Sequence, residues 1–297
     1  MPVDAITVVG PGRLGGALSL ALSNSGTNTE EIVYRSRYRA RALAALLDPH
    51  PEIISIDKLK KIRSPILIIA VQDEEILKVV RLIAGSLDGV KTVFHTSGSM
   101  SSDVLDDLRS PGRSVASIHP LASISNWSDG QDRFKGSFFC VEGDAKAVRV
   151  GKRLVSQLGG RSISIDSAQK SLYHAAALTA AGHVTALFDI AVGFMIKTGV
   201  DRRIARRMLQ PLLAGVSLNL ANQDTDEALT GTYARADGDT MERHLKALRS
   251  AASDDELKVY LELALRSIDL AKQAGADVRR LARMRKSIIV AKQKLGC

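Results

Sequence analysis

Lys170 and His174 are four residues apart in the segment SAQKSLYHAAALTAAGH, so a helix would place both side chains on one face. A lysine ammonium can protonate or polarise a substrate carbonyl or imine, and a neighbouring imidazole can relay or position that proton. The apolar remainder of the helix would desolvate the pair and lower the pKa of the lysine. An ordinary surface pair on a helix is the alternative interpretation.

Polar residues also follow three apolar runs, in the segments IAVQDEEI, FHTSGSMSS and SIHPLAS. If these runs are parallel strands, their carboxyl ends meet at one edge of a sheet, where α/β proteins bind ligands. We therefore expect His95, Ser97 and His119 to converge at this ligand-binding edge. For each residue taken singly, a structural histidine or a turn serine is the alternative.

The first turn reads VVGPGRLGGALSLAL and contains the pattern G-x-G-x-x-G at Gly10, Gly12 and Gly15. These glycines permit a tight turn, a close approach of the backbone to a pyrophosphate and close packing of the helix, whose N-terminus attracts phosphate. The motif is specific when it joins a strand to a helix in a βαβ unit. The sequence therefore predicts a dinucleotide site.

The second strand ends at Tyr34 and is followed by Arg35, Ser36 and Arg37. Sites that take NAD normally carry an acid here, which binds the ribose 2′-hydroxyl. Two guanidiniums and a hydroxyl would instead hold a 2′-phosphate, so the hypothesis is NADP. Solvated surface arginines, or an anionic deazaflavin in place of NADP, are the alternatives.

The elements that must position these residues fall into two groups. Short β-branched runs at residues 5–9, 31–34, 65–71, 91–95, 114–118, 137–141 and 162–165 predict strands. Helical patterns at 13–23, 39–47, 74–85, 102–108 and 144–158 lie between them. Beyond residue 166 there are only helical patterns, at 167–198, 202–222, 237–250, 254–275 and 278–295. We expect an α/β fold with a doubly wound Rossmann sheet at residues 1–165, followed by an all-α domain at 166–297.

Composition removes several classes of protein. A chain of 297 residues that is 45% hydrophobic and 25% charged is globular rather than disordered. Its net charge of +9 is concentrated in residues 35–41, 201–207 and 279–286. Aromatic residues are only 4%, which leaves few stacking platforms for nucleic acid, and the histidines lack the spacing of a zinc site.

Targeting and membrane signals are weak. The first segment, MPVDAITVVG, carries an acid at Asp4 and has no basic region or cleavage site, and the two cysteines, Cys140 and Cys297, cannot form a disulfide framework. We expect a cytoplasmic protein. Residues 175–196 are apolar and long enough to cross a bilayer, but they include His183 and Asp189 and lack an aromatic belt, so we predict a buried core helix.

The chain resembles a family of Rossmann-like oxidoreductases of unassigned substrate. The resemblance lies in the order of its motifs: the glycine turn, VQDEEI, HTSGS, SIHP, KxxYHAAA, PLLAGVSLNL and ALTGTYARAD. That family lies in the 6-phosphogluconate dehydrogenase-like group, with β-hydroxyacid dehydrogenases, pyrroline-5-carboxylate reductases and ketopantoate reductases. The resemblance covers nearly the whole chain. It implies an NADP-binding domain followed by a helical domain that closes the active site and often mediates dimerisation.

The chain also departs from these patterns. Lys170 matches the catalytic lysine of β-hydroxyacid dehydrogenases, but His174 replaces the asparagine that follows it there. The family's usual ASN is AGH here, with Gly182 at its centre, and its usual ALTGPxxRGD has Thr232 and Ala236 in place of Pro and Gly. These changes put the substrate clamp and the rigidity of the loop in question.

Together these observations predict an NADP(H)-dependent oxidoreductase that acts on the carbonyl or imine of a small, acidic substrate. The alternative is a non-catalytic NADP-binding or sensing protein. We expect a homodimer that binds neither nucleic acid nor membrane. Arg235 would clamp a substrate carboxylate or pair with Asp237. The predicted catalytic residues are Lys170, His174, His119 and Ser97; the cofactor residues Gly10, Gly12, Arg13, Leu14, Gly15, Arg35, Ser36, Arg37, Val71, Gln72 and Thr96; and the substrate residues Gly98 and Arg235.

Overall fold

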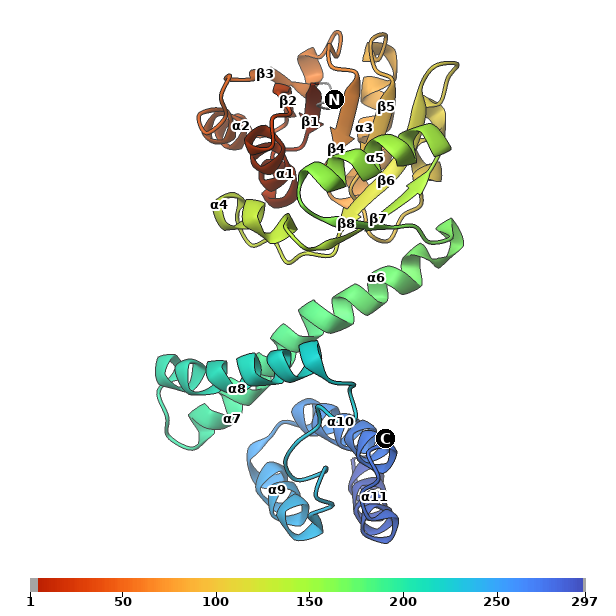
Figure 1. Ribbon diagram of the computed structural model, residues 1–297. Coiled ribbons are helices and arrows are strands. Elements are labelled where there is room, and N and C mark those ends of the chain that lie inside the picture. Colours follow the sequence, from red (N-terminus) through yellow and green to blue (C-terminus); the bar gives the residue numbers. More distant parts are fainter. Residues whose placement is uncertain (1–4, 296–297) are drawn as a thin grey trace. The chain divides into compact units, whose positions relative to one another are not determined.

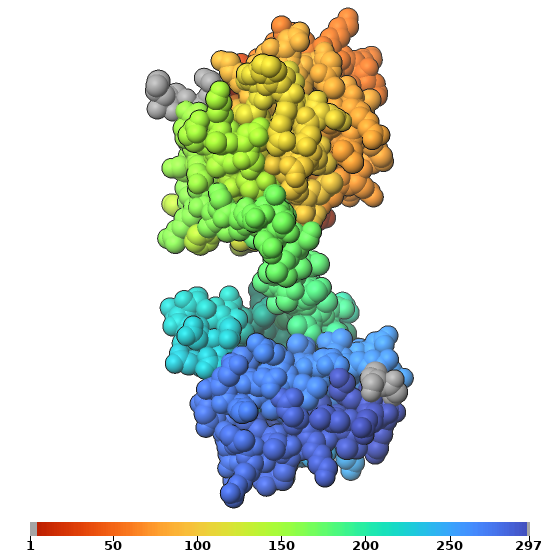
Figure 2. All heavy atoms as spheres, turned by 90° about the vertical axis from the view of Figure 1, so that its right-hand side faces the viewer, coloured from red at the N-terminus to blue at the C-terminus, as the bar shows by residue number. Residues whose placement is uncertain are grey.

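The computed structural model describes residues 5–295, so Asp4 and Cys297 lie outside the described part. The chain divides into two compact units, Met1–Gly182 and His183–Cys297. The division falls inside the long apolar helix, at its π-helical segment Thr179–His183. Each unit is a body of packed side chains (Figure 2) and is described by itself.

The N-terminal unit is built on an eight-stranded sheet in the order β3-β2-β1-β4-β5-β6-β7-β8 (Figure 1). All neighbouring strands are parallel except β6 and β7. The predicted fold class, a Rossmann sheet followed by a helical region, is confirmed. The strands are β1 (Ile6–Val9), β2 (Thr29–Tyr34), β3 (Glu52–Ser55), β4 (Ile66–Ile69), β5 (Thr92–His95), β6 (Ser114–Pro120), β7 (Phe138–Gly143) and β8 (Arg161–Ile163).

Two features of the sheet differ from the prediction. The edge strand β3 was not predicted, because four residues between prolines and a 3₁₀ turn leave too short a pattern. Strand β7 runs antiparallel to β6, because the link between them holds only the short helix α4 (Trp127–Gly130) and a 3₁₀ turn. Parallel neighbours are usually joined by a crossover helix that packs along the sheet, and this link has no helix of that length.

Helices cover both faces of the sheet. One buried cluster joins α1 and α5 to one face, and a second joins α3 to the other. Continuous burial of β1, β4 and β5 explains why these strands read as uninterrupted apolar runs. The helices of this unit are α1 (Arg13–Asn24), α2 (Arg37–Ala44), α3 (Asp73–Ile83), α4, α5 (Ala145–Gln157) and α6 (Lys170–Leu178), and Ser102–Leu108 is a 3₁₀ helix.

The order of the strands places a ligand site. Successive strands β1, β2 and β3 extend the sheet in one direction, and β4, β5 and β6 extend it in the other, so the order reverses between β1 and β4. At such a switch point the loops after the two strands separate and leave a crevice at the carboxyl edge. The glycine-rich turn follows β1, and Val71 and Gln72 follow β4.

The C-terminal unit is helical, with a core formed by α9, α10 and α11. Local signals mark both ends of α10: Ser253 and Glu256 form a capping box at its start, and Gly275 follows its end with φ 85°. The helices are α7 (Val184–Lys197), α8 (Arg202–Asn222), α9 (Gly238–Ala251), α10 (Asp254–Gln273) and α11 (Val278–Gln293).

The apolar helix at Ser167–Lys197 is long and apolar enough to cross a membrane by length and composition, and it is the one such helix among the described residues. Within this single chain, 6% of its most apolar window is buried. Only Lys170 is buried in α6 and only Val192 in α7.

Candidate active site

In the glycine-rich turn, a different physical constraint explains the glycine at each of the three positions. Gly10 has φ 95°, and a Cβ there would lie 2.6 Å from the carbonyl oxygen of Ala70. A Cβ on Gly15 would lie 2.2 Å from the carbonyl oxygen of Gly10, so this residue lets α1 pack against the turn. Around Gly12, by contrast, there is no atom within 4 Å of a built Cβ, so its backbone faces open space at the N-terminus of α1.

A cavity of about 650 Å³ opens over this turn at the switch point. Its walls come from the loops after β1, β2 and β4 and from the first turn of α3, the elements that hold a dinucleotide in Rossmann sheets. Backbone N–H groups at the start of α1 have no partner within the helix and are available to an anion. The cavity is lined by Val9, Gly10, Pro11, Gly12, Arg13, Leu14, Val33, Tyr34, Arg35, Ser36, Arg39, Ile56, Ala70, Val71, Gln72, Glu75 and Val79.

At the end of β2 the cavity carries both positive and negative charge. Arg35, Ser36 and Arg39 line it, and Arg39 was not among the predicted residues. Arg37, which was predicted, is exposed and does not line the cavity. The carboxylate of Glu75 also lines it and forms an ion pair with Arg35.

The loop after β5 is held from beneath by His95, which is 0% exposed. Nδ1 of His95 accepts a hydrogen bond from the Ser97 N–H at 3.2 Å, and Nε2 lies 3.1 Å from the Ser101 carbonyl oxygen and donates to it. Burial and the nearby Lys170 lower the pKa of His95 to about 4. His95 is therefore a neutral structural residue whose two ring nitrogens shape the loop.

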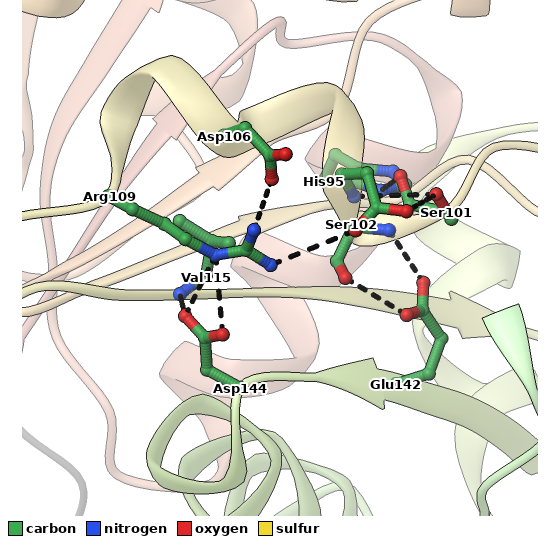
Figure 3. Close-up of polar contacts among 9 residues, drawn as sticks. His95, Ser101, Ser102, Asp106, Arg109, Val115, Glu142 and Asp144 are labelled. Atoms are coloured by element: carbon green, nitrogen blue, oxygen red, sulfur yellow. Dashed lines mark hydrogen bonds and ion pairs between the residues drawn. The ribbon is translucent and has the colours of Figure 1, made fainter.

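A carboxylate network anchors the far end of this loop (Figure 3). Glu142 on β7 accepts hydrogen bonds from the N–H and the hydroxyl of Ser102, at 2.8 and 3.0 Å. Arg109 pairs with Asp106 and Asp144, and Asp144 also accepts from the backbone N–H of Val115 on β6. The network ties the 3₁₀ helix Ser102–Leu108 to β6 and β7, so the loop that precedes it is fixed at both ends.

Lys170 reaches into the protein rather than out to solvent. Its side chain is 1% exposed, and Nζ donates to the Ser97 carbonyl oxygen at 3.1 Å and to Oγ of Ser117 at 2.7 Å. Burial lowers the pKa of this lysine, in the predicted direction. The ammonium group thus lies directly beneath the loop after β5 and fixes the position of its main chain.

Ser97 is occupied within the same loop. Its Oγ accepts hydrogen bonds from the N–H groups of Ser99 and Met100, at 3.2 and 3.1 Å. Ser99 in turn donates to Asp73 at 2.5 Å, which joins this loop to the start of α3 beside the dinucleotide cavity. Thr96 is buried, and its N–H is bonded to the carbonyl oxygen of Ile69 on β4.

Above the loop lies a cluster of aromatic polar side chains, which we call the histidine cluster: His119, Tyr173 and His174. Nδ1 of His119 is 2.9 Å from the hydroxyl of Tyr173, and the rings of His119 and His174 meet edge to face with centroids 5.8 Å apart. Burial and the charge of Lys170 lower the pKa of His119 to about 4, and burial raises the pKa of Tyr173. Both groups are therefore neutral near pH 7.

Gly98 is the point at which the loop contacts this cluster. A Cβ on Gly98 would lie 2.6 Å from Cδ2 of His174 and 2.7 Å from Nε2 of His119. Only a glycine lets both imidazoles approach the backbone this closely. Gly98, His119 and His174, which the sequence placed in one site, are thus brought together by the fold.

The segment ALTGTYARAD lies in the C-terminal unit. Ala236 is buried and adopts φ 49°, a left-handed conformation that is typical of glycine. Asp237 caps α9, accepting from the N–H and hydroxyl of Thr240 at 3.0 and 2.7 Å, and these bonds lower the pKa of Asp237. Arg235 is exposed and lines a separate cavity of about 590 Å³.

Two functional candidates were missed by the sequence argument. Tyr173 lies in the quoted KxxYHAAA segment, three residues after Lys170, and its helical spacing could have identified it. Glu75 enters the cavity from α3, and no local pattern indicates this. Arg39 belongs to the basic cluster that the sequence shows at residues 35–41, although it was not named as a site residue. Among the described residues there is no group of three or more His, Cys, Asp or Glu side chains that could hold a metal ion.

Comparisons with known proteins agree with this architecture. Residues 2–120 match the model of a Rossmann-like domain, and residues 137–267 match the domain of unknown function DUF2520. The chain therefore combines a Rossmann-like domain with a DUF2520 domain. A search of curated proteins finds no matching relative.

Solved structures share the fold along most of the chain. A Bacteroides fragilis protein described as a candidate NADP oxidoreductase is 22% identical, with a TM-score of 0.70 over 89% of this chain and 97% of that one. An imine reductase from Myxococcus stipitatus in complex with NADP⁺ is 18% identical, with a TM-score of 0.62 over 94% and 99%. A pyrroline carboxylate reductase from Plasmodium falciparum with NADP bound is 11% identical, with a TM-score of 0.59 over 96% and 98%. The protein thus shares a Rossmann-like fold with these structures along most of its length.

Proposed function

We propose that this protein is an NADP(H)-dependent oxidoreductase that reduces, or forms by the reverse reaction, the carbonyl or imine of a small, acidic substrate. The observation that supports this most directly is the open space over Gly12, at the start of α1 and within the cavity at the switch point. A pyrophosphate fits there because the backbone can approach it without a side chain in between. Arg35, Ser36 and Arg39 would hold the 2′-phosphate.

When bound, the nicotinamide would supply or accept the hydride, and the remaining work falls to the chain's own residues. The histidine cluster lies over the loop after β5, which Ser99 and Asp73 join to the wall of the dinucleotide cavity. Neutral Tyr173 and His119 can hold or move one proton across their 2.9 Å contact, and His174 packs against them. Lys170 positions the loop and adds a buried positive charge beneath it.

Thermal shift with NADPH, NADH and a deazaflavin in parallel tests this proposal, because a ligand that binds the native state raises Tm. We expect NADPH to stabilise the protein. The matched control is Gly12→Ala. Gly12 has φ −81°, and a Cβ built there has no atom within 4 Å, so the variant should fold normally. It should lose the rise in Tm with NADPH. Stabilisation by the deazaflavin alone would reassign the cofactor, and no shift with any of the three would contradict the proposal.

The alternative, a non-catalytic NADP sensor, is distinguished by turnover. A sensor would bind NADPH but oxidise it with no member of a panel of keto and imino acids. The histidine cluster favours the enzyme, because two neutral, hydrogen-bonded acid–base groups at the same edge of the sheet serve proton transfer and are not needed for binding alone.

We also propose that the protein is a cytoplasmic homodimer in which a second copy covers the apolar helices. Ile204, Met208 and Leu212 are spaced four residues apart on α8 and are 49%, 54% and 67% exposed. Asp189 within the apolar helix pairs with Arg202, an ion pair suited to water rather than lipid. A two-fold axis would bury the same surface on both copies. The free, buried thiol of Cys140 suits a reducing compartment.

A further inference from the structure

The end of β2 carries no acidic residue, but a carboxylate from α3, that of Glu75, lies at the same wall of the cavity. Glu75 belongs to the first turn of α3, which begins after β4, and its carboxylate lines the cavity together with Tyr34, Arg35 and Ser36. Its side chain is 16% exposed. A carboxylate in this wall of a Rossmann cavity is the kind of group that accepts hydrogen bonds from a ribose 2′-hydroxyl.

Glu75 also binds the guanidinium on which recognition of a 2′-phosphate depends. One carboxylate oxygen pairs with Nη2 of Arg35, and the other accepts from Nζ of Lys78 at 2.7 Å. The hydrogen bond from Lys78 and the charge of Arg35 lower the pKa of Glu75, so it is ionised in the working range of pH. Arg39 has no ion pair among residues 5–295 and remains available.

This arrangement has opposite consequences for the two nucleotides. A 2′-phosphate must draw Arg35 away from Glu75 and approach a carboxylate of like charge, so part of the attraction is lost. A 2′-hydroxyl suffers neither penalty and gains an acceptor. The same residue therefore weakens NADPH and supports NADH.

We infer that Glu75 determines nucleotide specificity. Because it holds Arg35 and offers a carboxylate to the ribose, the site binds both NADPH and NADH, and the two affinities differ only slightly. This inference rests on the proposed function. It predicts that removing the charge of Glu75 shifts the preference of the site toward NADPH, whereas removing Arg35 shifts it toward NADH.

Kd values for NADPH and NADH, measured from nicotinamide fluorescence, test this in the full-length protein. The variants are Glu75→Gln, Arg35→Ala and the double variant. Glu74→Gln is the matched control, because Glu74 lies in the same turn, is exposed and does not line the cavity. An unfolding transition measured without nucleotide confirms that each variant is folded.

We expect Glu75→Gln to raise the NADPH-to-NADH affinity ratio by about threefold to tenfold, the effect of removing one partly exposed charge, and Glu74→Gln to leave it unchanged. The increase should shrink when Arg35 is alanine, because the freed guanidinium carries part of it. The inference would be overturned if the NADPH-to-NADH affinity ratio of Glu75→Gln lay within twofold of wild type, or if the increase were equal with Arg35 and with alanine at that position. Neither result would contradict the proposed function. Wild-type protein that binds neither nucleotide would overturn the proposed function as well.

Discussion

The hydroxyl of Tyr173 lies 2.9 Å from Nδ1 of His119, and the centroid of the Tyr173 ring lies 5.9 Å from Nζ of the buried Lys170. The first contact joins the long helix to β6, and Nε2 of the same imidazole faces Gly98 in the loop after β5. Three segments far apart in the sequence thus place one neutral acid–base pair beside the edge of the sheet that holds the dinucleotide cavity.

Tyr173→Phe keeps the ring and removes the hydroxyl. We expect turnover to fall by about a hundredfold to ten-thousandfold, the usual contribution of one proton-transferring group, with NADPH affinity unchanged. Nitrogen NMR of the histidine rings should show a change of tautomer at His119, a readout that does not depend on the substrate. Tyr38→Phe is the control, since Tyr38 is 84% exposed. Unchanged turnover and an unchanged His119 spectrum would refute this role.

Gly98→Ala inserts a Cβ that would lie 2.6 Å from His174 and 2.7 Å from His119. One or both imidazoles must move, so we expect loss of turnover and a free energy of unfolding lower by about 1–3 kcal/mol, with NADPH still bound. Gly85→Ala, where a Cβ meets no neighbour, should be neutral. Urea denaturation and NADPH titration measure both effects, and full activity in Gly98→Ala would count against the histidine cluster as the site.

Lys170→Met keeps an unbranched side chain close to the length of lysine and removes the ammonium that binds Ser97 and Ser117. We expect turnover at least about tenfold lower and a loss of about 1–3 kcal/mol in the free energy of unfolding, because buried acceptors lose their donor. NADPH affinity should persist, since Lys170 does not line the cavity. Lys146→Met, at an exposed position of α5, is the control, and full turnover in Lys170→Met would remove Lys170 from the mechanism.

Acid should destabilise the fold through His95. Its pKa is about 4 in the folded protein against an ordinary value of 6.5, so below pH 6.5 the unfolded state takes up a proton that the folded state does not. Between pH 7 and 5 this costs about 2 kcal/mol of the free energy of unfolding. His95→Gln should be less stable at pH 7 but should lose less on acidification. Parallel pH curves for the two proteins would contradict the assignment.

Leu212→Glu tests the proposed dimer. Leu212 is 67% exposed in the single chain, so a charge there costs little in a monomer but would be buried without a partner between two copies. Light scattering after size exclusion should give a dimer for wild type and a monomer for Leu212→Glu. Leu82→Glu, at a leucine 55% exposed on α3, should remain dimeric. A monomeric wild type, or a dimeric Leu212→Glu, would contradict the proposal.

Most of the fold could be predicted because its signals are local. The run ILIIAV, the glycine turn and the capping residues each depend on neighbours within a few positions, and the structure places a strand, a helix start and helix ends where they indicate. Strand β3 and the reversed direction of β7 could not be predicted in this way. Four residues carry too little pattern, and strand direction depends on how a whole connection packs.

The sequence by itself determined the fold class, the glycine cradle and the set of polar residues at the strand ends. Only the tertiary structure decided what each of them touches. It turned Lys170 inward onto Ser97 and Ser117, brought Tyr173 to His119, and delivered Glu75 from α3 to Arg35 at the end of β2. The reason is physical: backbone conformation follows from neighbouring residues, whereas the partner of a side chain depends on which elements the core packs together.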